Sequence, residues 1–324
     1  MAETRFGKAL NQALADAMDA DDSVMLIGED IGIAGGSFGV TRGLMDRFGE
    51  QRVRDTPISE ATLLGAATGA ALSGLRPVVE IMFMDFITLA MDGLVNQAAK
   101  ARFMFGGQGS VPLVVRTPHG GGLSAGPQHS QCLEAWLAHV PGLKVVCPAT
   151  PADAYALLRA AIEDPDPVVF IEHKALYAAK GELPEPAPQA RIGEARVARP
   201  GSDLSIVSHG AALHQALDAA DRLAGEGIDA EVIDLRSLQP WDEGAVLASL
   251  AKTHRLVIHH EAVTAFGPGA EIAARMADIG FDELDAPILR VGAPFSPVPF
   301  AKSLEAEYQP SAERLIEAIR RLLA

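Results

Sequence analysis

Residues 143–171 read LKVVCPATPADAYALLRAAIEDPDPVVFI. Two short apolar runs, Leu143–Cys147 and Val168–Ile171, flank a helix candidate at 151–163. Continuous apolar runs of this length are typical of strands that are buried on both faces of a parallel sheet. The stretch therefore predicts a strand–helix–strand unit of an α/β fold.

The same alternation extends from this unit toward the N-terminus. Apolar residues recur at helical spacing between Phe6 and Met18, which predicts an amphipathic first helix. Further strand candidates are Val24–Ile27, Pro77–Ile81 and Val111–Arg116, and further helix candidates lie at 60–74, 86–103 and 129–138. Strands that alternate with helices predict a sheet covered by helices on both faces.

The composition changes near residues 182–200, which read ELPEPAPQARIGEARVARP. This proline-rich, polar segment predicts a linker with a short extended element. The alternation of strands and helices then resumes. Strands are expected at Leu204–Val207, Ala230–Leu235, Arg255–His260 and Ile288–Val291. Helices are expected at 211–225, 242–251, 267–278 and 310–323. We therefore expect two α/β domains, residues 1–185 and 200–324, joined by a linker at 186–199.

Charge and cysteine content exclude several classes of protein. The 324 residues include 27 Lys plus Arg and 42 Asp plus Glu, so the net charge is −15. This balance argues against nucleic acid and anionic membranes as partners. Cys132 and Cys147 are the two cysteines, too few for a disulfide framework. The N-terminal segment lacks the apolar core of a signal peptide, and no apolar stretch reaches 18 residues. We therefore expect a cytoplasmic protein.

Residues 119–126, HGGGLSAG, contain a G-x-S-x-G pattern centred on Ser124. With Asp234 and a late histidine such as His259, this pattern would make a serine hydrolase. The HGGG stretch resembles an oxyanion loop, but it overlaps the serine motif and shares Gly122 with it. One glycine cannot serve two loops that face each other across a substrate. A glycine-rich loop lining a site is therefore the favoured interpretation, and the hydrolase is the alternative from a different class.

Three further residues have both a functional and a structural interpretation. Glu60 follows Ser59, a possible helix cap, so its carboxylate either points into a cleft or is an ordinary first-turn glutamate, which spacing alone favours. Phe86 follows a strand end, where ligands gather in α/β folds, but it could equally pack in the core. His129 either transfers protons or makes a local hydrogen bond near a helix start.

Six short motifs, taken in order, resemble one family. They are Gly28–Asp30, Thr56–Glu60, Gly74–Pro77, Asn96–Lys100, Gln128–Gln131 and Pro141–Val146. Together they are similar to the β subunit of the thiamine-diphosphate-dependent E1 component of 2-oxo acid dehydrogenase complexes. The resemblance covers essentially the whole chain, including Pro297–Phe300.

This resemblance implies a transketolase-like pyrimidine-binding domain followed by a transketolase C-terminal domain. Thiamine diphosphate would be shared with an α subunit, whose GDG motif holds Mg²⁺ and the diphosphate. The present chain has no GDG, so it would be inactive alone. The implied partners are that α subunit, in an α2β2 heterotetramer, and a lipoyl-bearing E2 acyltransferase. A non-catalytic scaffold that docks E2 is a third interpretation.

The resemblance also assigns roles to individual residues. Glu60 matches the glutamate that hydrogen-bonds the N1′ ring nitrogen of the cofactor, and Phe86 matches the aromatic residue that stacks on the aminopyrimidine. Met82 lies in the same cofactor-binding region. His129 matches a histidine implicated in proton transfer or in acylation of the lipoyl arm. Glu29 matches an acidic residue that links paired active sites.

A structural K⁺ site is implied in the same way. The backbone of Leu113, Ala161 and Ile162 would supply carbonyl oxygens, together with Asp164 and Asp166. Several relatives have Asn where this chain has Asp166. Carbonyl and carboxylate oxygens suit hard cations in general.

Residues at a few positions favour some substrate classes of this family over others. Met82 and Phe86 stand where branched-chain enzymes tend to have Gln and Tyr, so a branched-chain E1 is the alternative rather than the first choice. The segments 103–107, 145–148 and 172–177 look most like acetoin dehydrogenase β subunits, with pyruvate dehydrogenase close behind.

Overall fold

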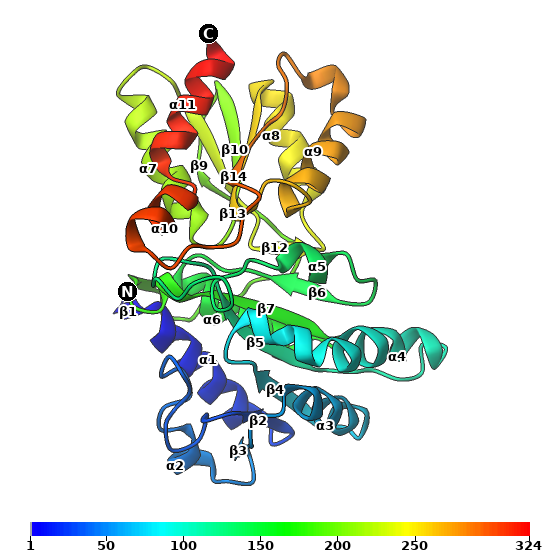
Figure 1. Cartoon of the computed structure of the whole chain (residues 1–324). Coiled ribbons are helices and arrows are strands. Elements are labelled where there is room, and N and C mark those ends of the chain that lie inside the picture. Colours follow the sequence, from blue (N-terminus) through cyan, green and yellow to red (C-terminus); the bar gives the residue numbers. More distant parts are fainter. Residues whose placement is uncertain (1) are drawn as a thin grey trace. The chain divides into compact units, whose positions relative to one another are not determined.

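The computed structural model describes residues 2–324, which divide into two compact units (Figure 1). The first unit runs to His119 and resumes at Trp136–Ile192. The second unit comprises Gly120–Ala135 and Gly193–Ala324. The segment Gly120–Ala135 is therefore grouped with the second unit, although first-unit sequence precedes and follows it.

A parallel sheet forms the core of the first unit. Its strands follow the order β6-β7-β5-β4-β2-β3, and every neighbouring pair runs parallel. They are β2 (Val24–Gly28), β3 (Val53–Asp55), β4 (Arg76–Glu80), β5 (Val114–His119), β6 (Lys144–Val146) and β7 (Val168–His173). The buried central strands confirm the α/β prediction for residues 24–171.

Helices α1 (Phe6–Ala20) and α6 (Pro151–Glu163) pack against each other beside this sheet. The apolar face of α1, including Leu10 and Leu14, is completely buried, as its spacing predicts. Thr150 caps α6, because its hydroxyl accepts a hydrogen bond from the Asp153 N–H at 3.1 Å. The unit also contains α2 (Leu44–Phe48), α3 (Glu60–Leu72), η3 (Lys174–Leu176) and an antiparallel pair, β1 (Ala2–Arg5) with β8 (Lys180–Leu183).

Two expected helices differ from the structure. The helix expected at 86–103 is instead a 3-10 turn η1 (Met84–Ala90), a π-helix η2 (Asp92–Ala98) and a short α4 (Ala99–Met104). Gly93 of η2 lies so close to α3 that an added Cβ would be 3.0 Å from the Leu64 Cβ. The helix expected at 129–138 is confined to α5 (Glu134–Ala138), because a turn in which the His129 N–H donates to the Gly126 carbonyl precedes it.

The second unit has its own sheet, in the order β14-β13-β10-β11-β9. The strands are β9 (Arg196–Arg199), β10 (Leu204–Ser208), β11 (Ala230–Asp234), β13 (Leu256–Val263) and β14 (Leu289–Ala293). All pairs are parallel except β9 with β11, so the short extended element expected in the linker text is confirmed as an antiparallel edge strand.

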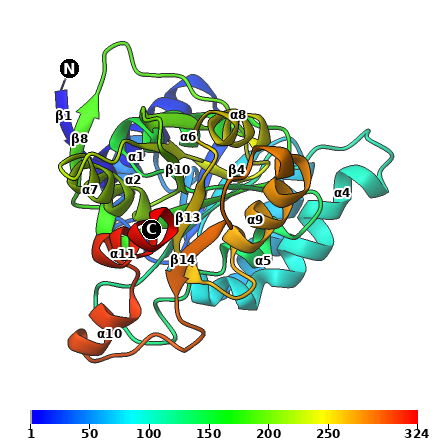
Figure 2. The same ribbon diagram turned by 90° about the horizontal axis from the view of Figure 1, so that it is seen from above.

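Helices cover both faces of this second sheet. α7 (Ala212–Ala224) and α11 (Ala312–Leu323) lie on one side, and α8 (Glu243–Thr253) and α9 (Pro268–Ile279) on the other (Figure 2). The remaining elements are β12 (Ser237–Gln239), η4 (Phe281–Glu283) and α10 (Lys302–Tyr308). Across residues 2–324, none of the helices combines the length and apolar character needed to cross a membrane.

Candidate active site

Glu60 is the first residue of α3, as the sequence predicts, and its side chain is 6% exposed. Ser59 occupies the cap position, but its hydroxyl donates to the Pro57 carbonyl at 2.9 Å instead of accepting from the helix. Within the part of the chain that the structure describes, no group donates a hydrogen bond to the Glu60 carboxylate. Its oxygens are not among the unpartnered side-chain atoms that are fully shielded from solvent, so they are open to a ligand that brings a hydrogen-bond donor.

Glu29 lies beside the start of the same helix. It follows β2, is 4% exposed and accepts a hydrogen bond from the Ser59 N–H at 2.9 Å. Burial raises the pKa of the Glu29 carboxyl, and the charge of Glu60 raises it further. Glu29 and Glu60 therefore form a pair of acidic groups held at the mouth of α3.

Aromatic side chains line the segment that follows β4. Phe86 packs edge-on against Phe83, with ring centroids 5.6 Å apart. Phe83 in turn contacts Phe38 at 5.9 Å, and the Lys174 ammonium lies 5.3 Å from its ring centroid. Met82 is half-buried next to Phe83. The Phe86 ring thus keeps an exposed part while its neighbour is fixed on three sides.

His129 belongs to the second unit and is the last residue of the turn that begins at Gly126. Its side chain is half-buried. Glu134, the first residue of α5, is completely buried, and its Oε1 lies 3.6 Å from His209 Nε2.

Family models and named relatives match this chain over nearly its whole length. A model of the transketolase pyrimidine-binding domain matches residues 2–180, and a model of the transketolase C-terminal domain matches residues 193–315. The β subunit of acetoin:2,6-dichlorophenolindophenol oxidoreductase from Bacillus subtilis is 48% identical over 97% of this chain and 96% of its own. The β subunit of the pyruvate dehydrogenase E1 component from the same organism is 42% identical over 100% of this chain and 99% of its own.

The chain belongs to the E1 β-subunit family. A rice mitochondrial relative, the E1 β-2 subunit of pyruvate dehydrogenase, is 45% identical over 97% of this chain and 85% of its own. The fold agrees as well, since a solved split-gene transketolase, described as an inactive β4 tetramer, gives a TM-score of 0.82. It covers 98% of this chain and 97% of its own at 22% identity. The transketolase-like fold is therefore confirmed, and the chain is a component of an oxidoreductase.

Three of the five groups that the family resemblance assigns to K⁺ already bind cationic side chains. Lys144 Nζ lies 2.7 and 2.6 Å from the two carboxylate oxygens of Asp164. Arg102 donates to Asp166, and Arg76 donates to the Ile162 carbonyl at 2.8 Å. The other two carbonyls also have donors: Leu113 accepts from the Val168 N–H at 2.9 Å and Ala161 from the Asp164 N–H at 3.3 Å. This arrangement does not fit a metal ion.

The serine-hydrolase alternative lacks its geometry. Ser124 Oγ donates to Glu305 Oε2 at 3.3 Å, and Asp234 accepts from Arg196 at 3.1 Å. His259 is completely buried with Nε2 2.9 Å from Gln215 Oε1, and burial, with His260 next to it, lowers its pKa to about 3. The three residues of the proposed hydrolase triad thus bind three different partners rather than one another.

Sequence reasoning missed a buried charged network in the first unit. Arg116 donates to Glu80 at 2.7 Å and to both oxygens of Glu172 at 2.7 and 2.8 Å, and the Tyr177 hydroxyl donates to Glu172 at 2.7 Å. Burial opposes the Arg116 charge, but the two carboxylates outweigh it and raise its pKa. A charged residue at the end of each of three apolar runs was the available signal.

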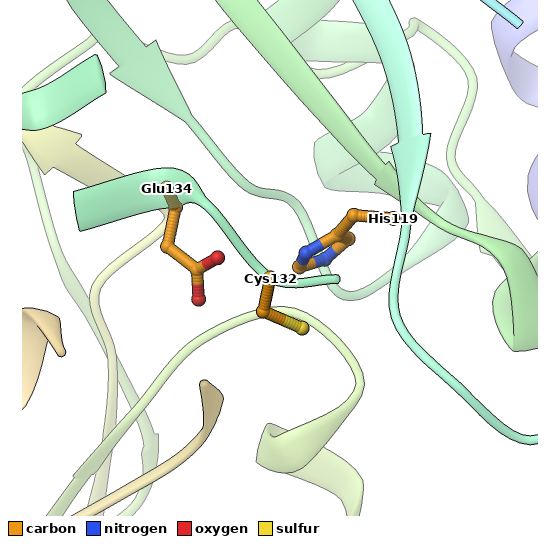
Figure 3. A group of neighbouring side chains, drawn as sticks. All are labelled: His119, Cys132 and Glu134. Atoms are coloured by element: carbon orange, nitrogen blue, oxygen red, sulfur yellow. The ribbon is translucent and has the colours of Figure 1, made fainter. Parts of the chain in front are cut away.

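Three side chains with metal-binding chemistry are drawn in Figure 3. His119 ends β5, whereas Cys132 and Glu134 project from the end of the Gly120–Ala135 segment (Figure 3). Because His119 belongs to the first unit and the other two to the second, they do not make up a metal site within either unit.

Proposed function

We propose that this chain is the β subunit of a thiamine-diphosphate-dependent E1 enzyme. With an α subunit, it would cleave acetoin or decarboxylate pyruvate and transfer the acyl group to the lipoyl group of an E2 acyltransferase. The observation that carries the proposal is Glu60, a buried residue at the start of α3 whose carboxylate oxygens receive no hydrogen bond within residues 2–324 and remain accessible. Full-length identity to named E1 β subunits supports it.

Glu60 fits one end of the cofactor. Thiamine diphosphate, when bound, supplies the carbon nucleophile that attacks the carbonyl substrate. The Glu60 carboxylate would share a proton with the N1′ nitrogen of the aminopyrimidine ring. Glu60 would thus hold or move a proton at N1′, and the carbon chemistry would be supplied by the cofactor itself. Burial strengthens such a hydrogen bond, because water does not compete for it.

The other residues that the resemblance names would have roles of their own. Phe86 presents the exposed part of its ring for stacking on the aminopyrimidine, and Met82 adds an apolar contact. Glu29 keeps the start of α3 in place through the Ser59 N–H and would link paired sites. His129 would deliver the proton that one lipoyl sulfur takes when the disulfide is reduced and the other sulfur accepts the acyl group.

A partner subunit completes this proposal. The chain has no GDG motif, so Mg²⁺ and the diphosphate would be held by the α subunit in an α2β2 heterotetramer. The net charge of −15 suits docking to a basic segment of E2. The K⁺ ion is not included, because its residues pair with Lys144, Arg102 and Arg76. The cytoplasmic location expected from sequence stays a prediction.

Acetoin is the first substrate to test, and pyruvate is the second. Two acetoin:2,6-dichlorophenolindophenol oxidoreductase β subunits, from Bacillus subtilis and Cupriavidus necator, are 48% and 47% identical to this chain. The pyruvate dehydrogenase relatives given above are somewhat less similar. Met82 and Phe86 weigh against branched-chain 2-oxo acids, which remain the alternative.

The proposal is tested by purifying the tagged chain from its own cells with the proteins that co-elute. Dye reduction is measured with acetoin, pyruvate and 2-oxoisovalerate, with and without thiamine diphosphate and Mg²⁺. We expect cofactor-dependent reduction with one substrate and a partner of α-subunit size. A chain that never binds the cofactor, with any partner, would refute the proposal.

Glu60→Ala provides the residue-level test. We expect at least about a 100-fold loss of turnover, because proton transfer by a positioned group contributes roughly 10²–10⁴-fold. Glu271→Gln is the matched control, since Glu271 is an exposed first-turn glutamate of α9. Turnover that survived Glu60→Ala in an intact complex would show that Glu60 has been misassigned.

A further inference from the structure

The Gly120–Ala135 segment is fastened to the second unit by carboxylates that lie far away in sequence. Glu305, on α10, accepts hydrogen bonds from the backbone N–H groups of Gly122 and Ser124, both at 2.9 Å. The Ser124 hydroxyl adds a third donor at 3.3 Å. Glu261 accepts from the Gly121 N–H at 2.6 Å. Two carboxylates therefore accept hydrogen bonds from four donors of one loop.

The backbone of this segment is shaped to present these donors. Gly122 and Ser124 have φ angles of 92° and 53°, in the left-handed region. Alternation of such residues turns successive N–H groups toward one side and creates an anion-binding concavity. In this molecule the anion is the chain's own Glu305, which is only 3% exposed. Hydrogen bonds to an ionised acceptor are roughly twice as strong as neutral ones.

Side chains of the second unit also fit closely against the loop. A Cβ at Gly121 would lie 2.3 Å from Gln309 Nε2, and one at Gly126 would lie 2.2 Å from the Phe300 ring. The HGGG and G-x-S-x-G patterns are therefore explained without a nucleophile. The glycines allow the loop to lie against α10 and its flanking residues, and Ser124 is a hydrogen-bond donor to Glu305.

The loop leads directly to His129. The His129 N–H closes the turn that begins at Gly126, two residues after Ser124. A displacement of about 1 Å in a reacting group can cost roughly 100-fold in rate. The accuracy of the His129 position thus depends on how firmly residues 121–126 are held.

We propose that Glu305 is a positioning residue of the E1 reaction, whose carboxylate fixes the glycine-rich loop and thereby places His129 for acyl transfer to the lipoyl arm. Glu261 has the same role at the loop's first donor. This inference rests on the proposed function, because it takes the role of His129 from there. It adds a residue from the C-terminal part of the chain to the determinants of one half-reaction.

The test uses the complete complex with its α subunit. Glu305→Ala and Glu305→Gln are compared with Glu307→Gln, because Glu307 is an exposed residue of the same helix. Each complex is assayed for dye reduction, which bypasses the lipoyl arm, and for acylation of an isolated lipoyl domain. Hydrogen–deuterium exchange of the peptide covering residues 120–132 is measured in parallel.

We expect Glu305→Ala to lower the kcat of lipoyl acylation about 10- to 100-fold. Dye reduction should change less than about threefold, and residues 121–126 should exchange faster. Glu305→Gln, which keeps one acceptor oxygen, should fall between, and Glu307→Gln should match the parent. Equal losses in both assays, or wild-type acylation with the loop released, would overturn the proposal.

If the Glu305 variants do not assemble with the α subunit, a milder substitution tests the same proposal. Glu261→Gln removes the charge of the acceptor at one loop N–H only, so it should raise exchange at Gly121 and lower acylation by a few-fold. Unchanged acylation together with faster exchange in this variant would also overturn the proposal. If the parent complex shows no cofactor-dependent turnover, the proposed function fails, whereas the exchange data still report whether Glu305 holds the loop.

Discussion

Glu29 accepts a hydrogen bond from the Ser59 backbone N–H at 2.9 Å, directly before Glu60 at the start of α3. The end of β2 and the beginning of α3 are thereby joined by one buried carboxylate. The charge of Glu60 raises the pKa of Glu29 in addition to the effect of burial. The two acidic groups are therefore coupled before any ligand is present.

Glu29→Gln should change how stability depends on pH. The folded-state pKa of Glu29 is raised above its unfolded value, so Glu29 contributes most stability at acid pH, where it is protonated. That contribution falls as pH rises through the raised pKa. We expect the stability of the parent relative to Glu29→Gln to decrease from acid to neutral pH. Urea unfolding at several pH values measures this, and a pH-independent difference would contradict it.

Phe86→Ala should weaken cofactor binding more than it weakens the fold. The Phe86 ring is half-exposed and contacts Phe83, so its loss should lower stability by about 1 kcal/mol. The concentration of thiamine diphosphate needed for half-maximal activity should rise about tenfold, since stacking of this kind contributes roughly 1 kcal/mol or more. Leu89→Ala, a change at an exposed residue of the same turn, is the control.

Arg116→Met should destabilise the first unit strongly. It leaves Glu80 and Glu172 buried without their cation, and such a loss costs about 3–5 kcal/mol. The melting temperature of the purified chain reports the effect. Arg47→Met, at the exposed Arg47–Asp19 pair, should change it little. The triple replacement of Arg116, Glu80 and Glu172 by apolar residues should recover part of the loss, because no unpaired charge remains.

Potassium should not stabilise the parent chain. Lys144 already neutralises Asp164, so the melting temperature should be the same in K⁺ and Na⁺ at equal ionic strength. Lys144→Met should lower the melting temperature and make it depend on K⁺, because Asp164 would then lack its partner. A higher melting temperature of the parent chain in K⁺ than in Na⁺ would contradict this prediction, because it would show that K⁺ binds in place of the Lys144 ammonium.

Much of the fold could be predicted from the sequence. The strands predicted at 24–27, 77–81, 168–171 and 204–207 all form, with Ile81 just beyond its strand, because short apolar runs of this kind are typical of the interior of a parallel sheet. The start of α3 at Glu60 was predicted as well. The segment expected as one helix at 86–103 is helical, but it changes from a 3-10 to a π to an α-helix along its length, and the close packing of Gly93 on α3 is a tertiary contact that no local pattern shows.

The ordered motifs in the sequence determined the family, and with it the expected roles of Glu60, Phe86 and His129. Only the tertiary structure decided the partners of buried charges. Arg116 meets Glu172 across 56 residues, and Glu305 meets Ser124 across 181. A sequence shows that a charge must be satisfied, but the group that satisfies it depends on which distant strands and loops the fold brings together.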